Sequence, residues 1–443
     1  MPARFHTRPI FVCTILLAAF CNLAAAKTLC VNPAGSSGCY SKIQDAVNAA
    51  ASFDVINVAA GIYKEDVVIG KPLSLLGAGA GTSVIDAKNL PNGILMDGLS
   101  NPGLHDVTVA GFSVRNALYE GVIVLNTTGA VVRDNRILLN DTIPHKFGSG
   151  AACDGQPAYE TDESGDCGGG LHLIGAVRAV VSGNTITGNA DGILISDETR
   201  ESRGNLIVRN IVTDNPEECG IVMASHAPMG AMPPHFAPHF GVNQNTISEN
   251  VVARNGVTVG GAGVGLFSDG AGPGRVSRNV IIRNELTGNG IPGVALHTHV
   301  GPNFGLPPDD MSANQIIANF ISGNGADGDD TATPGTAGIN INSGGGGSPV
   351  IGMIIAENII RDEDIAVAIS TPADVDVHLN NLLNGKIGVA NVCATDGASC
   401  AGTIDATQNF WGCSAGPNAG TCATTSGPGI RSTPWLTKAV LGD

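Results

Sequence analysis

A triplet of asparagines recurs along this chain at nearly constant intervals. Within each triplet the asparagines are five residues apart, and each triplet is followed by a Gly and a short apolar segment, such as GVGLFSD from Gly263. The four triplets are Asn205/Asn210/Asn215, Asn245/Asn250/Asn255, Asn279/Asn284/Asn289 and Asn314/Asn319/Asn324. Such regularity is typical of one supersecondary unit stacked many times, so the chain is predicted to form a solenoid.

The segment after each repeat Gly indicates which side chains face inward. Counting that Gly as position zero, positions one and three are apolar in every repeat, for example Val264 and Leu266. In a strand these positions point the same way, so they are predicted to form the interior, with positions two, four and six outside. The asparagines themselves suit turns and can bond to identical residues in adjacent coils. We therefore interpret them as scaffold.

The beginning of the repeat region predicts a different element. Ser41-Lys42-Ile43-Gln44 has the form of a capping box, and apolar residues then follow at helical spacing. We expect a short amphipathic helix that closes the first end of the solenoid and covers its open strand edges.

Three segments resemble known proteins. IQDAVNAAASFDVINVAAGIYKEDVVIGKPLSLLGAGAGTSVID resembles the start of pectin-methylesterase-like and pectate-lyase-like β-helices. The Asn-Ile repeats from about 131 to 381 resemble those of secreted carbohydrate-active proteins and of periplasmic maturation factors of nitrous oxide reductase. The closing NFWGCSAGPNAGTC resembles the terminal segment of such proteins. The resemblance implies an all-β, right-handed, single-stranded parallel β-helix with an N-terminal capping helix. The motifs of pectin methylesterases and polygalacturonases are absent, so no catalytic residue is transferred.

The N-terminus and the cysteines predict export. Residues 1–26 combine two arginines, an apolar stretch and a small-residue cleavage site, as a signal peptide does. Residues 27–408 are then expected to form the β-helix with its cap, and 409–443 a disulfide-stapled C-terminal cap. The expected pairs are Cys30/Cys39, Cys153/Cys167, Cys393/Cys400 and Cys413/Cys422, with Cys219 left as a buried thiol. We expect a secreted or periplasmic monomer with no membrane span.

The net charge limits the possible partners. A formal net charge of −16 disfavours binding to nucleic acids and to anionic membranes. A groove along stacked strands suits an extended glycan, so a polysaccharide is the expected partner.

Ionisable residues gather at the outward position six of successive repeats. That position reads Glu198, His226, Asp269 and His299. We expect His226 or His299 to act as a general base, oriented by Asp269, in a polysaccharide lyase or epimerase. The expected substrate-binding residues are Glu198, Phe267, His297, His235 and His239.

Metal binding and a purely structural role are the alternatives. Asp327, Asp329 and Asp330 form an oxygen-rich loop suited to calcium, and the acidic loop between Cys153 and Cys167 is a second candidate. Zinc or copper is a weaker alternative, with ligands among the histidines and Asp269. The runner-up function is a non-catalytic carbohydrate-binding or interaction scaffold, or a periplasmic metal-centre maturation factor.

Overall fold

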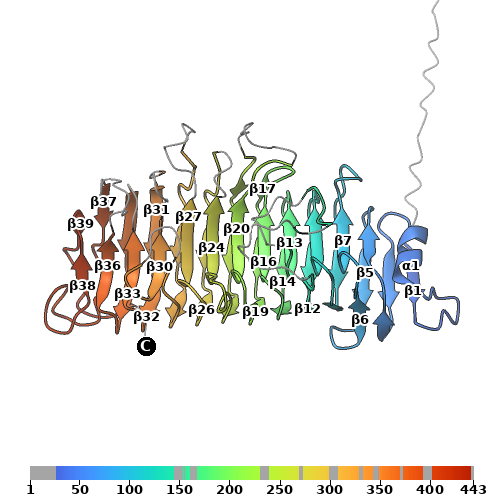
Figure 1. Ribbon diagram of the computed structural model, residues 1–443, viewed down its shortest axis with the longest axis horizontal. Coiled ribbons are helices and arrows are strands. Elements are labelled where there is room, and N and C mark those ends of the chain that lie inside the picture. Colours follow the sequence, from blue (N-terminus) through green and yellow to red (C-terminus); the bar gives the residue numbers. More distant parts are fainter. Residues whose placement is uncertain are drawn as a thin grey trace, which may run out of the picture.

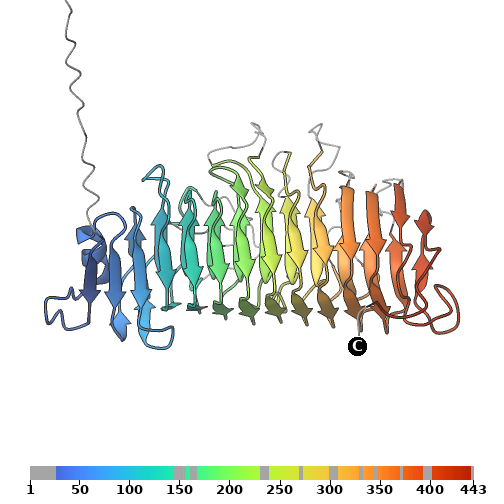
Figure 2. The same ribbon diagram turned by 180° about the vertical axis from the view of Figure 1, so that it is seen from behind.

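A computed structural model describes most of the chain after the predicted signal peptide. The described residues are 26–143, 153, 155–159, 167–229, 239–268, 273–298, 308–328, 333–342, 348, 350–369, 373–392 and 402–440. Within them the chain winds as a right-handed parallel β-helix in which three long sheets run along one axis (Figures 1 and 2). In that part of the chain no helix is long and apolar enough to cross a membrane. The predicted fold class is confirmed.

The largest sheet has 14 parallel strands and begins at the N-terminal end. Its members are β1 (Thr28–Val31), β2 (Val55–Val58), β5 (Ser74–Gly77), β8 (Thr108–Ala110), β11 (Val131–Arg133), β14 (Val180–Ser182), β18 (Leu206–Val208), β22 (Thr246–Ser248), β25 (Val280–Ile282), β28 (Gln315–Ile317), β31 (Val350–Ala356), β34 (Ala373–His378), β37 (Gly402–Asp405) and β39 (Ile430–Arg431).

The 11-stranded sheet follows the first across a short turn that contains the middle Asn of each triplet. Its members are β3 (Gly61–Tyr63), β6 (Ser83–Asp86), β9 (Ser113–Arg115), β12 (Arg136–Leu138), β15 (Thr185–Thr187), β19 (Ile211–Thr213), β23 (Val251–Ala253), β26 (Glu285–Thr287), β29 (Phe320–Ser322), β32 (Ile359–Arg361) and β35 (Asn381–Leu383).

The 12-stranded sheet is built from the segments that follow each repeat Gly. Its members are β4 (Val67–Ile69), β7 (Ile94–Asp97), β10 (Val122–Leu125), β13 (Leu171–Ile174), β16 (Ile193–Ser196), β20 (Ile221–Ser225), β24 (Val264–Ser268), β27 (Val294–Thr298), β30 (Ala337–Ile341), β33 (Ile365–Ile369), β36 (Ile387–Asn391) and β38 (Thr424–Ser426). A separate two-stranded sheet pairs β17 (Ser202–Arg203) with β21 (Val242–Asn243).

The predicted inward positions form the core. Val264 and Leu266 are fully buried in one continuous apolar cluster that runs the length of the coil, and their counterparts in neighbouring repeats lie in the same cluster. The outward positions two and four belong to separate, smaller clusters, such as Leu194, Val222 and Ala224. The alternation is that of a strand with one face inside, so the predicted register is confirmed.

The asparagines form hydrogen-bonded ladders through the interior of the turns. In the ladder of the middle asparagines, each side-chain amide from Asn135 to Asn380 donates to the Asn Oδ1 of the next coil over 2.9 to 3.1 Å, and the backbone N–H of the same residue donates to that oxygen too. The middle ladder runs through Asn135, Asn184, Asn210, Asn250, Asn284, Asn319, Asn358, Asn380 and Asn409. This satisfies buried turn groups that would otherwise be costly.

A different residue ends the ladder made by the last Asn of each triplet. This ladder passes from Asn289 to Asn324, and Asn324 then donates both its backbone N–H and its side-chain amide to Oε1 of Glu363. Burial raises the pKa of the Glu363 carboxyl to about 7, even though the Asn324 hydrogen bonds oppose the shift.

The N-terminal end is closed by the helix α1 (Ile43–Ala49), as predicted (Figure 1). Its cap differs from the predicted capping box. The N-cap residue is Lys42, which makes no side-chain cap, and the carboxylate of Glu65 accepts the N–H groups of Ile43 and Gln44 at 2.8 and 2.9 Å. A distant acid therefore satisfies the first turn in place of Ser41.

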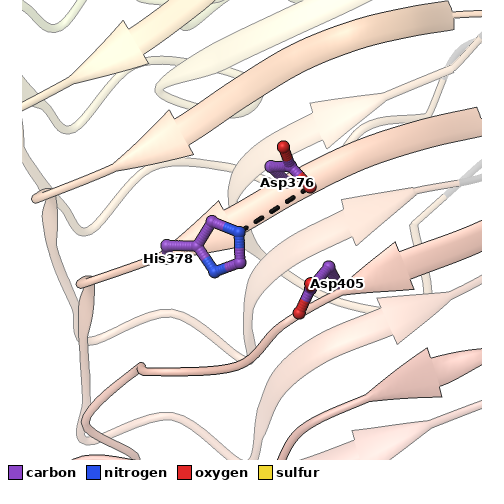
Figure 3. Close-up of side chains that lie close together, drawn as sticks. All are labelled: Asp376, His378 and Asp405. Carbon is purple, nitrogen blue, oxygen red and sulfur yellow. Dashed lines mark ion pairs between the residues drawn. The ribbon is translucent and has the colours of Figure 1, made fainter.

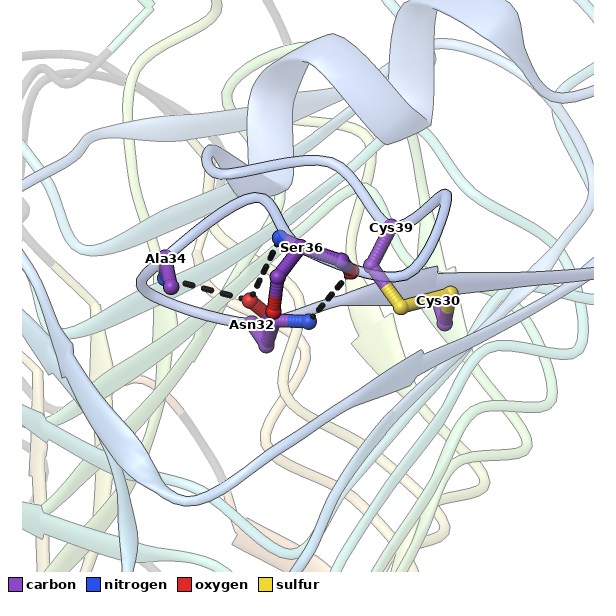
Figure 4. The surroundings of a disulfide bond; sticks show 5 residues. All are labelled: Cys30, Asn32, Ala34, Ser36 and Cys39. Atoms are coloured by element: carbon purple, nitrogen blue, oxygen red, sulfur yellow. Dashed lines mark hydrogen bonds between the residues drawn. A yellow bond between two sulfur atoms is a disulfide. The ribbon is translucent and has the colours of Figure 1, made fainter.

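Disulfides staple both ends of the described chain. Cys30–Cys39 closes the loop before α1, where Asn32 accepts N–H bonds from Ala34 and Ser36 (Figure 4). Cys153–Cys167 and Cys413–Cys422 are also paired, as expected. The pair Cys393/Cys400 and the predicted signal peptide lie outside the described residues, and the division at 408/409 stays a prediction.

Candidate functional site

The outer face of the 12-stranded sheet brings an aromatic ring and a histidine side by side. Phe267 on β24 is the direct lateral neighbour of His297 on β27, and Ala224 on β20 flanks Phe267 on its other side. All three occupy position four of their repeats. Because β20 ends at Ser225, His226 projects from the turn just beyond it, and its ring meets Phe267 edge-on with centroids 6.2 Å apart.

His226 is held by a buried carboxylate. Its Nδ1 lies 2.7 Å from Oε1 of Glu198, one coil earlier, and both side chains are almost fully buried. Burial alone would raise the pKa of the Glu198 carboxyl, but the hydrogen bond and charge of His226, assisted by His172 and Ser196, hold it below its usual range. An ionised Glu198 accepts the Nδ1 proton, so Nε2 is the nitrogen that exchanges a proton in the neutral imidazole.

His297 has a carboxylate partner of its own. Its Nε2 lies 2.6 Å from Oδ2 of Asp327, which also accepts a hydrogen bond from the Asn340 amide at 2.9 Å. Asp327 is buried and His297 nearly so. Because Oδ2 accepts from two donors, the Asp327 carboxyl is in the acceptor state, and His297 donates through Nε2.

A groove of about 490 Å³ lies over these side chains. Its floor is the outward apolar surface of the sheet, including Leu194, Val222 and Ala295, and His226, Phe267 and His297 line it as well. The loop residues Glu218 and Val259 form part of its wall. Among the described residues that line the groove there is no Lys or Arg.

A second buried acid supports the turn beneath His226. Asp197 accepts hydrogen bonds from the N–H of His226 at 2.8 Å, from the Ser225 hydroxyl at 3.1 Å, and from the N–H of Gly241. Ser225 Oγ also lies 3.1 Å from Nδ1 of His239. Burial and the neighbouring Glu198 charge raise the pKa of Asp197 to about 7. Asp197 and His239 thus brace the turn that presents His226.

The free thiol of Cys219 also lines the groove. Burial raises its pKa to about 12, despite an N–H from Ala262 that lies 3.2 Å from the sulfur. A thiol that stays protonated is a poor nucleophile.

The structure describes some of the sequence-predicted site residues and not others. Glu198, His226, His239, Phe267 and His297 are described. His226, Phe267 and His297 line the groove, Glu198 bonds to His226, and His239 bonds to Ser225 in the same turn. Asp327, expected to bind calcium, bonds to His297. The remaining predicted residues, His235, Asp269, His299, Asp329 and Asp330, lie outside the described residues.

Two relationships were missed at the sequence level. Glu198 was expected to contact substrate, and in the structure it lies buried behind His226 and bonds to it. The second relationship is the bond between Asp327 and His297, which lie 30 residues apart in the sequence. The sequence alone did not link these two residues. The Glu198–His226 pair could have been predicted, because both residues occupy position six of consecutive repeats.

One further cluster lies away from the groove, on the 14-stranded sheet. Asp376 and His378 on β34 and Asp405 on β37 place one ligand atom each within 4.8 Å of one another (Figure 3). Asp376 and Asp405 are direct lateral neighbours, and Arg431 pairs with Asp405. The guanidinium already offsets the charge of the second carboxylate, so we assign no ion to this cluster.

Several solved structures share this architecture at low sequence identity. The Azotobacter vinelandii mannuronan C-5 epimerase AlgE6 A-module aligns over 89% of this chain and 93% of its own, with 12% identity and a TM-score of 0.51. The Agl-KA catalytic domain (87% of this chain, 12% identity, TM-score 0.54) and the Dettilon tailspike protein (85%, 12%, 0.51) are also similar, and this chain spans 62% of each.

These likenesses concern the fold. No curated protein matches the chain. A family model described as "right handed beta helix region" matches residues 87–305, a stretch that contains Glu198, His226, Phe267 and His297. Residues 87–305 therefore resemble a right-handed β-helix region in sequence as well as in fold.

Proposed function

We propose that this protein binds an extended polysaccharide along the groove and transfers a proton at a bound sugar, as a lyase or epimerase does. The observation that carries the proposal is the pair of histidine–carboxylate dyads, Glu198–His226 and Asp327–His297, whose histidines line one groove together with Phe267. Two imidazoles with buried carboxylate partners supply a base and a proton or hydrogen-bond donor within a single site.

His226 is the base in this proposal. Glu198 accepts its Nδ1 proton, which orients the ring and stabilises the imidazolium that forms when Nε2 takes a proton. Since Glu198 is buried, its role is to position His226 and not to contact the glycan. Asp269 and His299 keep their proposed roles as orienter and alternative base.

Phe267 and His297 bind the sugar. The half-buried Phe267 ring offers an apolar surface to a sugar face. His297 lies one strand beyond Phe267 and two strands beyond the coil of His226, about 10 Å along the axis at the usual strand spacing. That separation leaves room for one sugar ring between the two histidines.

The reaction needs an acidified C–H bond, as at C5 of a uronosyl residue. His226 Nε2 takes the C5 proton, and the electron pair is delocalised into the sugar carboxyl group, where protonated His297 donates a hydrogen bond. In elimination the pair then forms the C4=C5 bond while the C4–O bond breaks, and the leaving oxygen takes a proton from water. In epimerisation water delivers a proton to C5 from the opposite face, and the His226 imidazolium then returns its proton to the solvent.

A panel of polysaccharides tests the proposal. Purified protein is incubated with uronic-acid-containing and neutral polymers, and products are followed by ultraviolet absorbance for unsaturated ends and by proton NMR for inverted residues. We expect His226→Gln to lose at least 100-fold in rate. His378→Gln, a histidine outside the groove, serves as the matched control. Full activity in His226→Gln would refute the assignment.

The absence of Lys and Arg from the described groove lining favours a second candidate function. Together with the net charge of −16, it suits a neutral glycan that is bound without chemistry. In that case no polymer of the panel is altered, and His226→Gln binds a neutral glycan as well as the native protein does.

A further inference from the structure

The Glu198–His226 dyad is one end of a longer buried chain. His172 Nε2 lies 2.7 Å from Ser196 Oγ, and Ser196 donates to Oε2 of Glu198 at 2.5 Å. At the far end His172 Nδ1 lies 3.2 Å from Oε1 of Glu120. These side chains come from the coils of four adjacent strands, β10, β13, β16 and β20, and each is at most 4% exposed.

The proton positions in this chain follow from donor and acceptor counts. Ser196 has one hydroxyl hydrogen and donates it to Glu198, so its oxygen accepts from His172, whose Nε2 therefore carries a proton. His172 Nδ1 lies 3.2 Å from a carboxylate oxygen of Glu120 but makes no hydrogen bond among the described residues, so Glu120 acts on the ring through its charge. The Ser196 hydroxyl thus donates to Oε2 of Glu198, and His226 Nδ1 donates to Oε1 of the same carboxylate.

We infer that Glu120, His172 and Ser196 are positioning residues that hold Glu198 as a carboxylate and thereby hold the proton of His226 on Nδ1. The inference rests on the proposed role of His226 as base. If Glu198 were protonated, it would donate to Nδ1 of His226, and the neutral ring would then carry its own proton on Nε2. A ring in that tautomer cannot take a proton through Nε2 from a sugar.

The surroundings of His226 make Glu198 the group that decides this tautomer. Asp197 contacts His226 through the backbone N–H, and Phe267 presents a ring edge or face, so neither bonds Nδ1. Glu198 occupies Nδ1 at 2.7 Å. Burial works against the charge of Glu198, and the bonds from Ser196 and His226 together with the charge of His172 oppose that effect.

The experiment reads the tautomer directly. Protein labelled with ¹⁵N only in histidine gives ring-nitrogen shifts that separate the two tautomers, and His226→Gln identifies the His226 signals. Ser196→Ala is compared with Ser196→Thr, which keeps the hydroxyl, and with Ser277→Ala, another buried serine with one side-chain hydrogen bond. Glu120→Gln is a nearly isosteric second variant in case Ser196→Ala fails to fold.

We expect the native protein and Ser196→Thr to show the Nδ1–H tautomer of His226. Ser196→Ala and Glu120→Gln should shift the population toward Nε2–H and move the pH dependence of the His226 signals, with Ser277→Ala unchanged. On a substrate that is turned over, kcat should fall about tenfold with KM unchanged, since one charge-assisted hydrogen bond is lost.

His226 signals in Ser196→Ala and Glu120→Gln that match the native spectrum would overturn the inference, whether or not a glycan is turned over. If the tautomer shifts as expected and no polysaccharide is altered by native protein, the buried chain stands and the proposed function falls.

Discussion

Glu363 offers a sharp test of how the asparagine ladders contribute to stability. It takes the place of an asparagine at the end of one ladder, where its Oε1 accepts two bonds from Asn324. Burial raises the pKa of its carboxyl from 4.5 to about 7. Replacing it by Gln keeps the acceptor oxygen and removes the ionisable group.

The sign of the effect follows from proton linkage. Between pH 4.5 and about 7 the folded protein binds more protons at Glu363 than the unfolded chain does, so stability falls as the pH rises through this window. At 1.36 kcal/mol per pKa unit, the raised pKa of Glu363 corresponds to a loss of about 3 kcal/mol in the free energy of unfolding. Relaxation of the protein around the charge reduces this loss to about 1–2 kcal/mol. Glu363→Gln should therefore be more stable than native protein above pH 7, and nearly equal to it at pH 4.

The assay is guanidinium unfolding at pH 4 and pH 8, followed by the fluorescence of the two tryptophans. Glu285→Gln, at an exposed position of β26, controls for the loss of one surface charge. The reasoning would be refuted if Glu363→Gln gained the same free energy of unfolding at both pH values, or gained none at pH 8.

Three further predictions concern single residues. Asn284→Ala removes amide bonds to Asn319 and to the Ile247 carbonyl, and calorimetry should show a loss of about 3 kcal/mol; a loss below about 1 kcal/mol contradicts the ladder's role. Glu65→Gln should weaken the α1 cap by about 1 kcal/mol and speed hydrogen exchange at the first helical amides, and unchanged exchange counts against it. Cys219 should resist iodoacetamide at pH 8 in the folded protein and react after unfolding, so rapid labelling of native protein would disprove its protonated state.

The repeat allowed much of the fold to be predicted from sequence, because period-two alternation and a constant Gly position determine which side chains share a face. Phe267 and His297 could be placed as near neighbours in this way. The partners of the histidines were harder to predict. Asp327 reaches His297 from a turn inside the next repeat, and Glu65 reaches α1 from beyond β3, so no fixed spacing marks either contact.

The burial of polar residues also could not be predicted from the sequence. His172 sits at position two of its repeat, which the alternation predicts to point outward, yet it is fully buried. Register determines the direction of a side chain along the sheet, but the loops that cover the outer face determine its exposure. The chain from Glu120 to His226 therefore became visible only with the loops in place.

The ladders also have a direction. Every rung donates toward the C-terminal end, from Asn135 to Asn184 and onward to Asn409, so the amide dipoles align along the axis with their positive ends pointing that way. A negative acceptor is consequently favourable after the last donor and unfavourable before it. Glu363 occupies that last place in its own ladder. An asparagine-to-aspartate change at an interior rung would set a carboxylate oxygen against the Oδ1 of the next asparagine, so even this single-atom exchange would weaken the turn.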